Sequence, residues 1–399
     1  MSLVDPECYP HLNGDDRQIC AGCFDDIDLK SLIREAGQFG PCDFCRTPRA
    51  KVVELSHVTQ HIGERANTFY GKAVEQLPYE SAEGGYQGEN FDTYELLTNH
   101  IGIELPRDID GDLLGAIACE LGDDQWCAFD WTQLEINESL AYSWRRFSEI
   151  VKHERRFFFQ GSLRRGGPPD DRSPIQFFHE LWDLLRQLGR VRTYQPGLHL
   201  FRARPRSAGQ RHTSPAALGP PLPEFALQAN RMNPPGIPMF YGADSERLAV
   251  AEVRNERVSL ARFETTREIQ VIDLVDLPSV PGFFSDASRQ RIQGLYFLHD
   301  FAHEISLPVP RDERVHVEYL PTQVFTEFLR DARFGDRPID GIRYPSATPT
   351  KGANLVLFAT QRDVVDGEEF DPWPFYPPEP WLRLTRVTQK RGGARNSDH

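Results

Sequence analysis

The sequence predicts an α+β protein built from a small cysteine module, a mainly helical segment and a larger domain of mixed strands and helices. Three observations lead to this class. Paired Cys-x-x-Cys motifs stand near the N-terminus, and an amphipathic helical stripe follows them. The second half carries short apolar strands that helices interrupt without regular alternation. The 399 residues are enough for two or three domains and a sizeable core.

Residues 1–50 form the predicted cysteine module. Cys20 and Cys23 make one Cys-x-x-Cys motif, and Cys42 and Cys45 make a second one after eighteen intervening residues. Two such motifs supply four thiolates in a tetrahedron, which is typical of a closed structural zinc site. The alternative is a pair of free dithiols or disulfides. Because so short a module holds little core without a metal, we expect structural Zn²⁺.

The next part, residues 51–160, is predicted to be a helical domain. Leu140, Trp144, Phe147 and Val151 are spaced as the apolar stripe of an amphipathic helix. Residues 161–174 are rich in Pro, Gly and Arg, so they predict a flexible linker.

Residues 175–384 are predicted to form the larger α+β domain, with a leading helix at 175–188 and a long Pro-rich loop at 205–224. Strands are expected at 198–201, 239–242, 269–274, 339–343 and 354–359, and further helices at 246–255, 288–305 and 321–332. Residues 385–399 are predicted to be a disordered tail.

Charge and hydropathy exclude several partners. The net charge of −14 argues against nonspecific nucleic-acid binding, because neutralising phosphates needs a basic surface. The sequence contains no run of eighteen apolar residues, so it predicts no membrane span. The N-terminus lacks the features of a secretory signal. We therefore expect a cytoplasmic protein. Of two local basic clusters, residues 202–212 have a better claim to hold an anionic ligand than residues 145–156.

A catalytic pocket is predicted around residues 231–252. Arg231 leads into a Pro/Gly turn, and the turn leads into a short apolar strand that contains Tyr241. The following helix carries Glu252 in an otherwise apolar run. A buried charge must be paired or must serve a purpose, so this carboxylate is the first candidate for chemistry.

From about residue 196 to 365 the chain resembles the RES domain family, named for an arginine, a glutamate and a serine. The matching pieces occur in the family's order: Leu200-Phe-Arg202, Arg231-Met-Asn-Pro-Pro-Gly236, Pro238-Met-Phe-Tyr241, Ala251-Glu-Val253, and Asp340-Gly-Ile-Arg-Tyr-Pro-Ser346 leading into Asn354-Leu-Val-Leu-Phe358. The segment between the first two pieces, which holds the Pro-rich loop, departs from the family in length.

The resemblance implies an ADP-ribosyltransferase-like fold and an enzyme, hydrolase or transferase, that consumes NAD⁺. It also implies a bacterial toxin or defence effector with an antitoxin or immunity protein as partner. The family's name-giving residues carry over to Arg202, Glu252 and Ser346, while a second arginine and a tyrosine carry over to Arg231 and Tyr241. NAD⁺ is then the expected substrate.

The chemistry needs these residue types. Cleavage of the nicotinamide glycosidic bond develops positive charge on the ribose, which a carboxylate such as Glu252 stabilises. Arginines bind pyrophosphate with two charge-assisted bonds, a role that fits Arg202 and Arg231. Tyr241 suits contact with nicotinamide or ribose, and Ser346 suits support of the ribose or of the carboxylate. The sequence leaves water, phosphate and a protein side chain open as acceptors.

Two rival functions remain open. The helical segment resembles the HEPN-like extension of some RES proteins, through Trp144-Arg-Arg-Phe147 and the run from Val151 to Phe159. Arg146 and His153 fit the R-x4–6-H arrangement of HEPN ribonucleases, which usually act as dimers, because seven residues make almost two helical turns. A HEPN-type ribonuclease whose RES domain senses a nucleotide is the first rival. The second is an inactive interaction protein.

Overall fold

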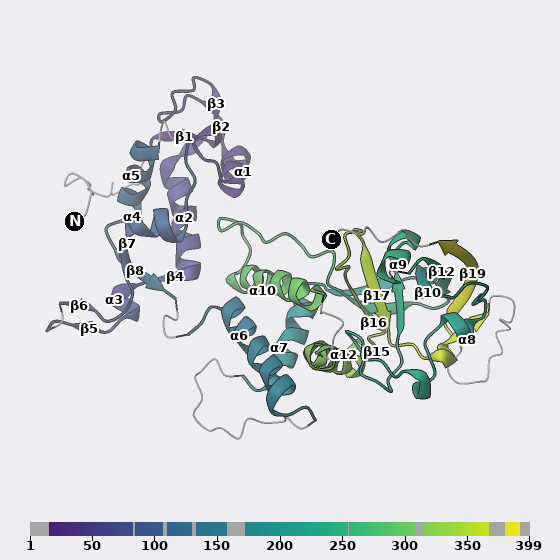
Figure 1. The fold of residues 1–399 in the computed structure, drawn as a ribbon. Helices are drawn as coiled ribbons and strands as arrows, with labels where there is room; N and C mark the ends of the chain where they lie inside the picture. Colours follow the sequence, from purple (N-terminus) through teal and green to yellow (C-terminus); the bar gives the residue numbers. More distant parts are fainter. Residues whose placement is uncertain are drawn as a thin grey trace, which may run out of the picture. The chain divides into compact units, whose positions relative to one another are not determined.

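The computed structural model describes residues 16–82, 84–106, 110–129, 133–157, 172–253, 255–308, 314–366 and 380–391. The chain divides into two compact units (Figure 1). The first unit comprises Met1–Glu135 and Ser279–Gln293, and the second comprises Ile136–Pro278 and Gly294–His399. The α+β class predicted from the sequence is confirmed.

The first unit opens with a three-stranded antiparallel sheet in the order β1-β3-β2. Its elements are β1 (Gln18–Cys20), η1 (Ala21–Cys23), α1 (Ile27–Ala36), β2 (Gln38–Gly40) and β3 (Ala50–Glu54). Helix α1 begins where the Asp26 carboxylate accepts hydrogen bonds from the backbone N–H groups of Asp28 and Leu29, at 2.8 and 3.0 Å. This N-cap satisfies two donors that the first helical turn leaves free.

The rest of the first unit is mainly helical, as predicted. Its helices are α2 (Leu55–Phe69), α3 (Ala73–Gln76), α4 (Thr93–Glu95), η2 (Leu96–His100) and α5 (Asp110–Leu121). Short strands join them: β4 (Tyr70–Lys72), β5 (Tyr79–Glu80), β6 (Gly85–Tyr86), β7 (Phe91–Asp92) and β8 (Gln125–Ala128). One apolar cluster joins Phe24 and Ile33 of the cysteine module to Ile62 of α2 and Ile117 of α5. The cysteine module therefore shares its core with the helices that follow.

The second unit begins with a helix that the sequence groups with residues 51–160. Helices α6 (Ile136–Glu149) and η3 (Ile150–Glu154) pack with α7 (Pro174–Gln187), α10 (Arg289–Ser306) and α12 (Leu320–Asp331). Aromatic pairs hold this group together: the ring centroids of Trp144 and Phe301 lie 5.0 Å apart, and those of Phe147 and Phe178 lie 4.8 Å apart. The compact units thus divide the chain elsewhere than the predicted domains, because the aromatic stripe of α6 faces helices of the second unit. Most of the predicted linker at 161–174 lies outside the described residues.

A nine-stranded mixed sheet forms the body of the second unit, in the order β18-β19-β12-β10-β11-β17-β16-β13-β9 (Figure 1). The strands are β9 (Val191–Tyr194), β10 (His199–Pro205), β11 (Phe240–Ala243), β12 (Arg257–Thr265), β13 (Ile269–Asp273), β16 (Gly341–Pro345), β17 (Ala353–Leu357), β18 (Val364–Asp366) and β19 (Leu382–Arg391). Shorter pieces complete the unit: α8 (Pro215–Leu218), η4 (Pro223–Phe225), α9 (Glu246–Val253), α11 (Val315–Glu318), β14 (Arg333–Phe334), β15 (Arg337–Pro338) and η5 (Gln361–Asp363).

The two faces of this sheet carry different cores. One face holds Leu200, Phe240 and Phe263 in a large apolar cluster. On the other face, Ala243 and Leu260 pack with Leu248 and Ala249 of α9. Because successive side chains of a strand alternate between faces, the strand residues on the α9 side are the ones that can meet α9 and its carboxylate.

One sequence prediction about the C-terminal end of the chain needs correction. Residues 385–391, predicted as the start of a disordered tail, form most of β19, because their backbone pairs with β12 from Arg262↔Arg386 to Arg257↔Arg391. Residues 392–399 lie outside the described part of the chain. The Pro-rich loop at 205–224 is ordered in the structure, with Leu218 of α8 fully buried. No helix within the described residues is long and apolar enough to cross a membrane.

Candidate functional site

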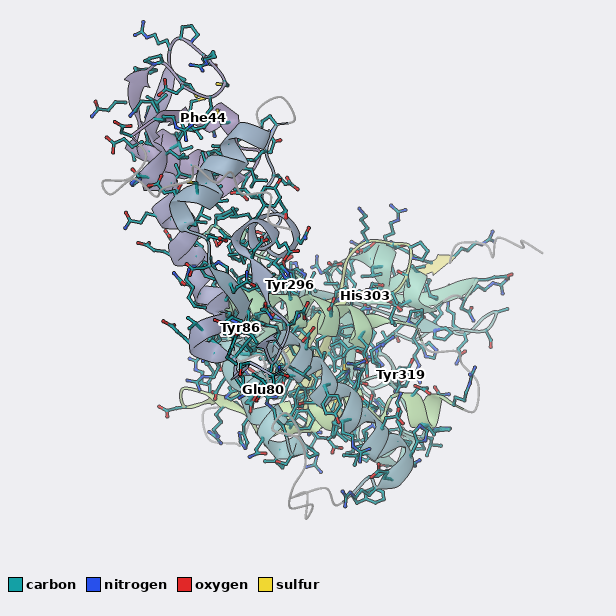
Figure 2. All side chains as sticks on the ribbon, turned by 90° about the vertical axis from the view of Figure 1, so that its left-hand side faces the viewer. Phe44, Glu80, Tyr86, Tyr296, His303 and Tyr319 are labelled. Carbon is teal, nitrogen blue, oxygen red and sulfur yellow. The ribbon has the colours of Figure 1, made fainter. Side chains whose placement is uncertain are left out.

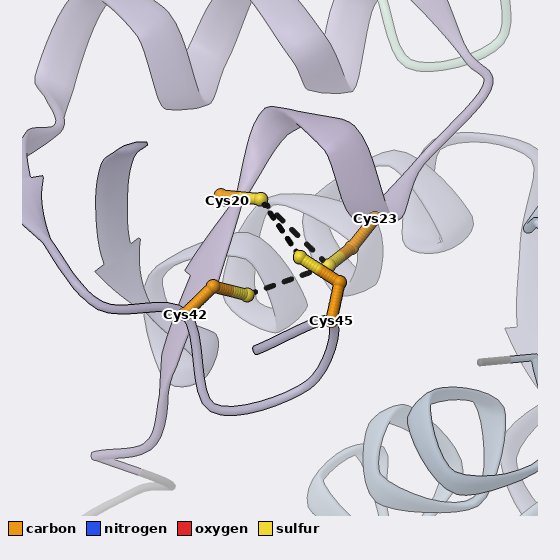
Figure 3. A group of neighbouring side chains, drawn as sticks. All are labelled: Cys20, Cys23, Cys42 and Cys45. Carbon is orange, nitrogen blue, oxygen red and sulfur yellow. Dashed lines mark hydrogen bonds between the residues drawn. The ribbon is translucent and has the colours of Figure 1, made fainter. Parts of the chain in front are cut away.

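The four predicted metal-ligating cysteines lie together in the first unit (Figure 3). The Sγ atoms of Cys20 and Cys45 are 3.5 Å apart, those of Cys23 and Cys42 are 3.5 Å apart, and those of Cys20 and Cys23 are 3.9 Å apart. A tetrahedral zinc ion with Zn–S bonds of about 2.3 Å requires sulfur atoms about 3.8 Å apart. These distances fit such an ion, and they are far too long for disulfide bonds.

Backbone turns hold the cysteines in place. The N–H of Cys42 donates to the carbonyl of Thr47 at 2.9 Å, and the N–H of Asp43 donates to the carbonyl of Gln18 at 2.8 Å. Arg46 adopts a φ of 60°, the left-handed conformation that closes the turn after the second motif. Three of the thiols are buried and Cys45 is half-buried. Since all four positions of a tetrahedron are taken by sulfur, the site leaves no place for a reacting water.

The predicted catalytic carboxylate lies on the α9 face of the large sheet. Glu252 is half-buried near the end of α9, and its Oε1 accepts a hydrogen bond from Ser346 Oγ at 2.7 Å. The same oxygen accepts a second bond, from Asn354 Nδ2, at 2.7 Å. The structure therefore joins the predicted glutamate and serine directly. Among the described residues, Oε2 of Glu252 has no hydrogen-bond partner, so it stays available to a ligand.

Local structure fixes the serine. Ser346 follows the last residue of β16, and its N–H donates to the carbonyl of Gly352 at 3.1 Å. Its Oγ in turn accepts a bond from the N–H of Thr348 at 3.1 Å. An oxygen that already accepts a backbone N–H directs its own proton elsewhere, and here the proton goes to Glu252.

Asn354 is the site residue that the sequence reasoning missed. It stands at the start of β17 opposite Tyr344 of β16. A polar amide at the start of the apolar run Asn354-Leu-Val-Leu-Phe358 could have indicated this site residue. This run already belonged to the family resemblance.

The predicted tyrosine is bonded to the Pro/Gly turn. Tyr241 Oη donates to Asn233 Oδ1 at 2.6 Å and accepts a bond from the N–H of Met232 at 3.3 Å. Burial raises the pKa of Tyr241 well above its usual value. This phenol therefore stays protonated and ties the turn after Arg231 to β11.

Arg231 caps the end of α10. Its Nη2 donates to the carbonyl of Leu307 at 2.7 Å, and its Nη1 donates to the carbonyl of Ile305. The guanidinium lies 5.4 Å from the ring centroid of Tyr319, which is labelled in Figure 2. Cations at a helix C-terminus complement its carbonyls and dipole. Arg231 therefore has a structural role as a cap on the C-terminal end of α10.

Tyr344 connects this arginine to the carboxylate. The side chain is buried on the α9 face, and burial raises its pKa. The charge of Arg231 acts to lower that pKa, while the charge of Glu252 acts to raise it. The charges of Arg231 and Glu252 thus act in opposite directions on one buried phenol.

Arg202 lies differently from the other predicted site residues. Its neighbours Phe201 and Ala203 pack on the α9 face, so Arg202 leaves β10 on the opposite side. Strands β10 and β11 are aligned at a single pair, Phe201↔Ala243, and Arg202 Nη1 donates to the carbonyl of Tyr241 at 3.0 Å. Burial, followed by the charge of Arg204, lowers the pKa of Arg202 to about 10. Arg202 is therefore charged at neutral pH and touches the site through the backbone of β11, with no hydrogen bond to Glu252.

The predicted ribonuclease pair is not joined by a contact. Arg146 Nη1 forms an ion pair with Glu154 Oε1 at 2.7 Å, and among the described residues His153 is exposed without a hydrogen bond. Helix α6 ends at Glu149, and residues 150–154 form a π-helical turn. The α-helical spacing on which the prediction rested therefore ends before His153, and the ribonuclease role of the pair stays a prediction.

Comparison with known families agrees with this architecture. Residues 199–377 match the family model of the RES domain, and residues 35–164 match that of HEPN/RES N-terminal domain 1. The chain therefore belongs to the RES-domain proteins that carry this N-terminal domain, as its sequence motifs predicted. No curated protein and no solved structure matches the chain.

Proposed function

We propose that this protein cleaves NAD⁺ at the nicotinamide glycosidic bond. The RES domain links the chain to chemistry on NAD⁺. The observation that carries the specific reaction is the arrangement of Glu252. Two donors, Ser346 and Asn354, bind one oxygen of its carboxylate and leave the other oxygen without a partner among the described residues.

A carboxylate held in this way is suited to a developing cation. The hydrogen bonds to Oε1 fix the orientation of the carboxylate before the substrate arrives. The free Oε2 can accept a ribose hydroxyl or stand beside the anomeric carbon as positive charge develops there. An interaction that strengthens as charge develops lowers the barrier rather than only tightening binding.

The neighbouring side chains suit the rest of NAD⁺. Arg231 uses two of its five N–H donors on α10, so three remain for a pyrophosphate oxygen. Tyr241, half-buried on the same face as Glu252, offers aromatic surface for nicotinamide or ribose. Arg202, through its bond to the carbonyl of Tyr241, positions β11 and adds positive charge near the site.

The simplest reaction uses water as the acceptor. The bond between the ribose anomeric carbon and the nicotinamide nitrogen breaks, and its electron pair leaves with neutral nicotinamide. A water oxygen bonds to the anomeric carbon, and its proton passes to solvent, giving ADP-ribose. Phosphate or a protein nucleophile would take the place of water in a phosphorolysis or an ADP-ribosyl transfer.

The test compares nicotinamide release by the full-length wild type and by Glu252→Gln at saturating NAD⁺. Glutamine keeps an oxygen that can accept both hydrogen bonds but removes the negative charge. We expect a loss of about 10²–10³-fold in kcat. Glu256→Gln, an exposed carboxylate four residues further on, is the matched control and should leave the rate unchanged. Equal rates for wild type and Glu252→Gln would refute the mechanism.

The same assay identifies the acceptor and the biological role. ADP-ribose as product indicates water, ADP-ribose 1″-phosphate indicates phosphate, and label retained on protein indicates transfer. We also propose that the activity makes the protein a toxin, restrained by an antitoxin or immunity protein. Expression of the wild type should then lower cellular NAD⁺ and slow growth, whereas expression of Glu252→Gln should do neither.

A further inference from the structure

Among the described residues, β19 is paired on both sides only at Leu382–Leu384. On one side, β12 pairs with β19 from Leu382 to Arg391. On the other side, β18 reaches only Leu382–Leu384. Within the described chain, no strand pairs with the outer edge of residues 385–391. Seven residues make an edge of about 20 Å, and an open edge presents a row of backbone N–H and C=O groups that can accept another strand.

A pocket of about 390 Å³ lies at this edge. The end of β18 contributes Asp366 to its lining, and the segment before α8 contributes Thr213. That segment is tied to the sheet, because Gln389 Nε2 donates to the carbonyl of His212 at 3.4 Å and the N–H of His212 donates to Ser259 Oγ at 3.2 Å. The pocket thus has β19 as its base, with Asp366 and Thr213 on its sides, and it lies beside the strand.

Two arginines of the edge are exposed, and the charge of one of them, Arg386, acts on Glu246, whose pKa it helps to lower. Arg386 and Arg391 are exposed and have no ion pair or side-chain hydrogen bond with any described residue. The other cations nearby are partly used: Arg383 binds Glu264 at 3.1 Å, and Lys390 binds Glu246. The titratable groups of this region are Arg262, Arg383, Arg386, Lys390 and Arg391 against Glu246, Glu264 and Asp366. In a chain of net charge −14, cations outnumber acids among these described residues.

We propose that this edge binds an extended, acidic peptide of a partner protein, which adds a strand beside residues 385–391. Main-chain hydrogen bonds would supply affinity in such strand addition, and side-chain contacts would supply selectivity. Acidic side chains spaced two residues apart lie on one face of the added strand, where they would meet Arg386; Arg391, five residues further on, lies on the opposite face of the sheet. The β-bulge at Thr385, where the register shifts between Arg262 and Phe263, increases the local twist and turns the open part of β19 away from β18.

Charge also decides between this occupant and two others. A second copy of β19 would set these cations against one another across the new ladder, which is destabilising. A nucleic acid would satisfy the arginines but not the alternating N–H and C=O groups of the edge. An acidic peptide satisfies both.

The edge lies away from Glu252 in the sheet, and its link to the helix that carries Glu252 is the ion pair of Lys390 with Glu246. In the sheet, β19 is divided from β11 and β17 by β12 and β10. The proposal therefore does not depend on the proposed NAD⁺ reaction, and the two can fail independently.

The test uses the full-length protein and a fluorescent nine-residue peptide of alternating Glu and Val. We expect the anisotropy of this peptide to report saturable binding that Arg386→Glu weakens at least about tenfold. Arg192→Glu is the matched control, because Arg192 is an exposed arginine on β9, the edge strand at the other end of the same sheet. Nicotinamide release should be the same in all three proteins.

Three further probes separate the mechanisms. A Lys/Val peptide should not bind, and an acidic peptide N-methylated at alternate amides should lose binding because it cannot form the ladder. Hydrogen exchange of residues 385–391 should slow when the Glu/Val peptide is added. The proposal is overturned if the Glu/Val peptide does not bind, if the N-methylated peptide binds equally well, or if Arg386→Glu weakens only the binding of an RNA oligonucleotide. In each of those cases the arginines serve only to prevent edge pairing or to hold nucleic acid.

Discussion

Asn354 and Ser346 donate to the same oxygen of Glu252, each at 2.7 Å. Asn354 is 102 residues from Glu252 in sequence, and the two meet because β17 runs next to β11 on the face that α9 covers. The carboxylate is therefore oriented from two strands at once. Because both donors hold the carboxylate, we predict that losing either one lowers kcat, although neither donor touches the reacting atoms.

We expect Asn354→Ala to lower kcat about tenfold with little change in KM, because hydrogen bonds to charged groups are worth about 1.5–3 kcal/mol and half of the support remains. Asn354→Asp should be worse, since an ionised aspartate cannot donate to Glu252 and its charge repels that carboxylate. Steady-state kinetics measure both effects. A change confined to KM would assign Asn354 to substrate binding instead, and Asn255→Ala, an exposed asparagine after α9, serves as control.

Arg231 should contribute to stability as well as to NAD⁺ binding. Its side chain caps the carbonyls of Ile305 and Leu307, so Arg231→Ala leaves them without a donor. We expect unfolding free energy to fall by about 1–3 kcal/mol in urea titrations without NAD⁺. Arg291→Ala, an exposed arginine of the same helix, should change stability by less than about 0.5 kcal/mol. Unchanged stability of Arg231→Ala would show that the cap contributes nothing and would leave only the ligand role.

The cysteine cluster should hold one zinc ion per chain, measured by metal analysis of protein prepared without chelator. Because Phe24 and Ile33 share a core with α2 and α5, chelation should raise hydrogen exchange in those helices as well as in residues 16–54. Cys42→Ser should lose the metal, while Cys127→Ala, at a buried cysteine outside the cluster, should keep it. A metal-free wild type would disprove the zinc site, and a response limited to the first fifty residues would show that the module unfolds alone.

The sequence predicted most apolar elements of the second unit because their patterns are local. Strands β10, β11, β13, β16 and β17 and helices α7, α9, α10 and α12 lie within a few residues of their predicted positions. Strand β19 was missed because Arg383, Thr385, Gln389 and Arg391 make it look like a polar tail. Its strand conformation depends on pairing with β12, more than a hundred residues away, and nothing local signals that pairing.

The candidate site divides in the same way. Family motifs predicted Glu252 and Ser346 together, and the structure joins them by a hydrogen bond. The capping role of Arg231 depends on where α10 ends. The position of Arg202 behind β11 depends on where β10 and β11 separate. Those are tertiary facts that single-sequence patterns do not contain.

The boundary of the second unit gives the last prediction. The sequence predicts that a fragment beginning near Ser173 folds by itself, but such a fragment lacks α6. Its loss would uncover Phe177, Phe178 and Phe301, all almost completely buried beneath Trp144 and Phe147. Deleting one large aromatic side chain from a core costs about 3–5 kcal/mol. We therefore expect the fragment 173–399 to be insoluble or to bind a hydrophobic dye, and the fragment 136–399 to melt cooperatively. Both fragments retain residues 279–293, so this comparison isolates α6. Equal stability of the two fragments would place the boundary at the predicted linker after all.

A point mutation in the full chain tests the same packing. Trp144→Ala should lower the free energy of unfolding by about 3–5 kcal/mol.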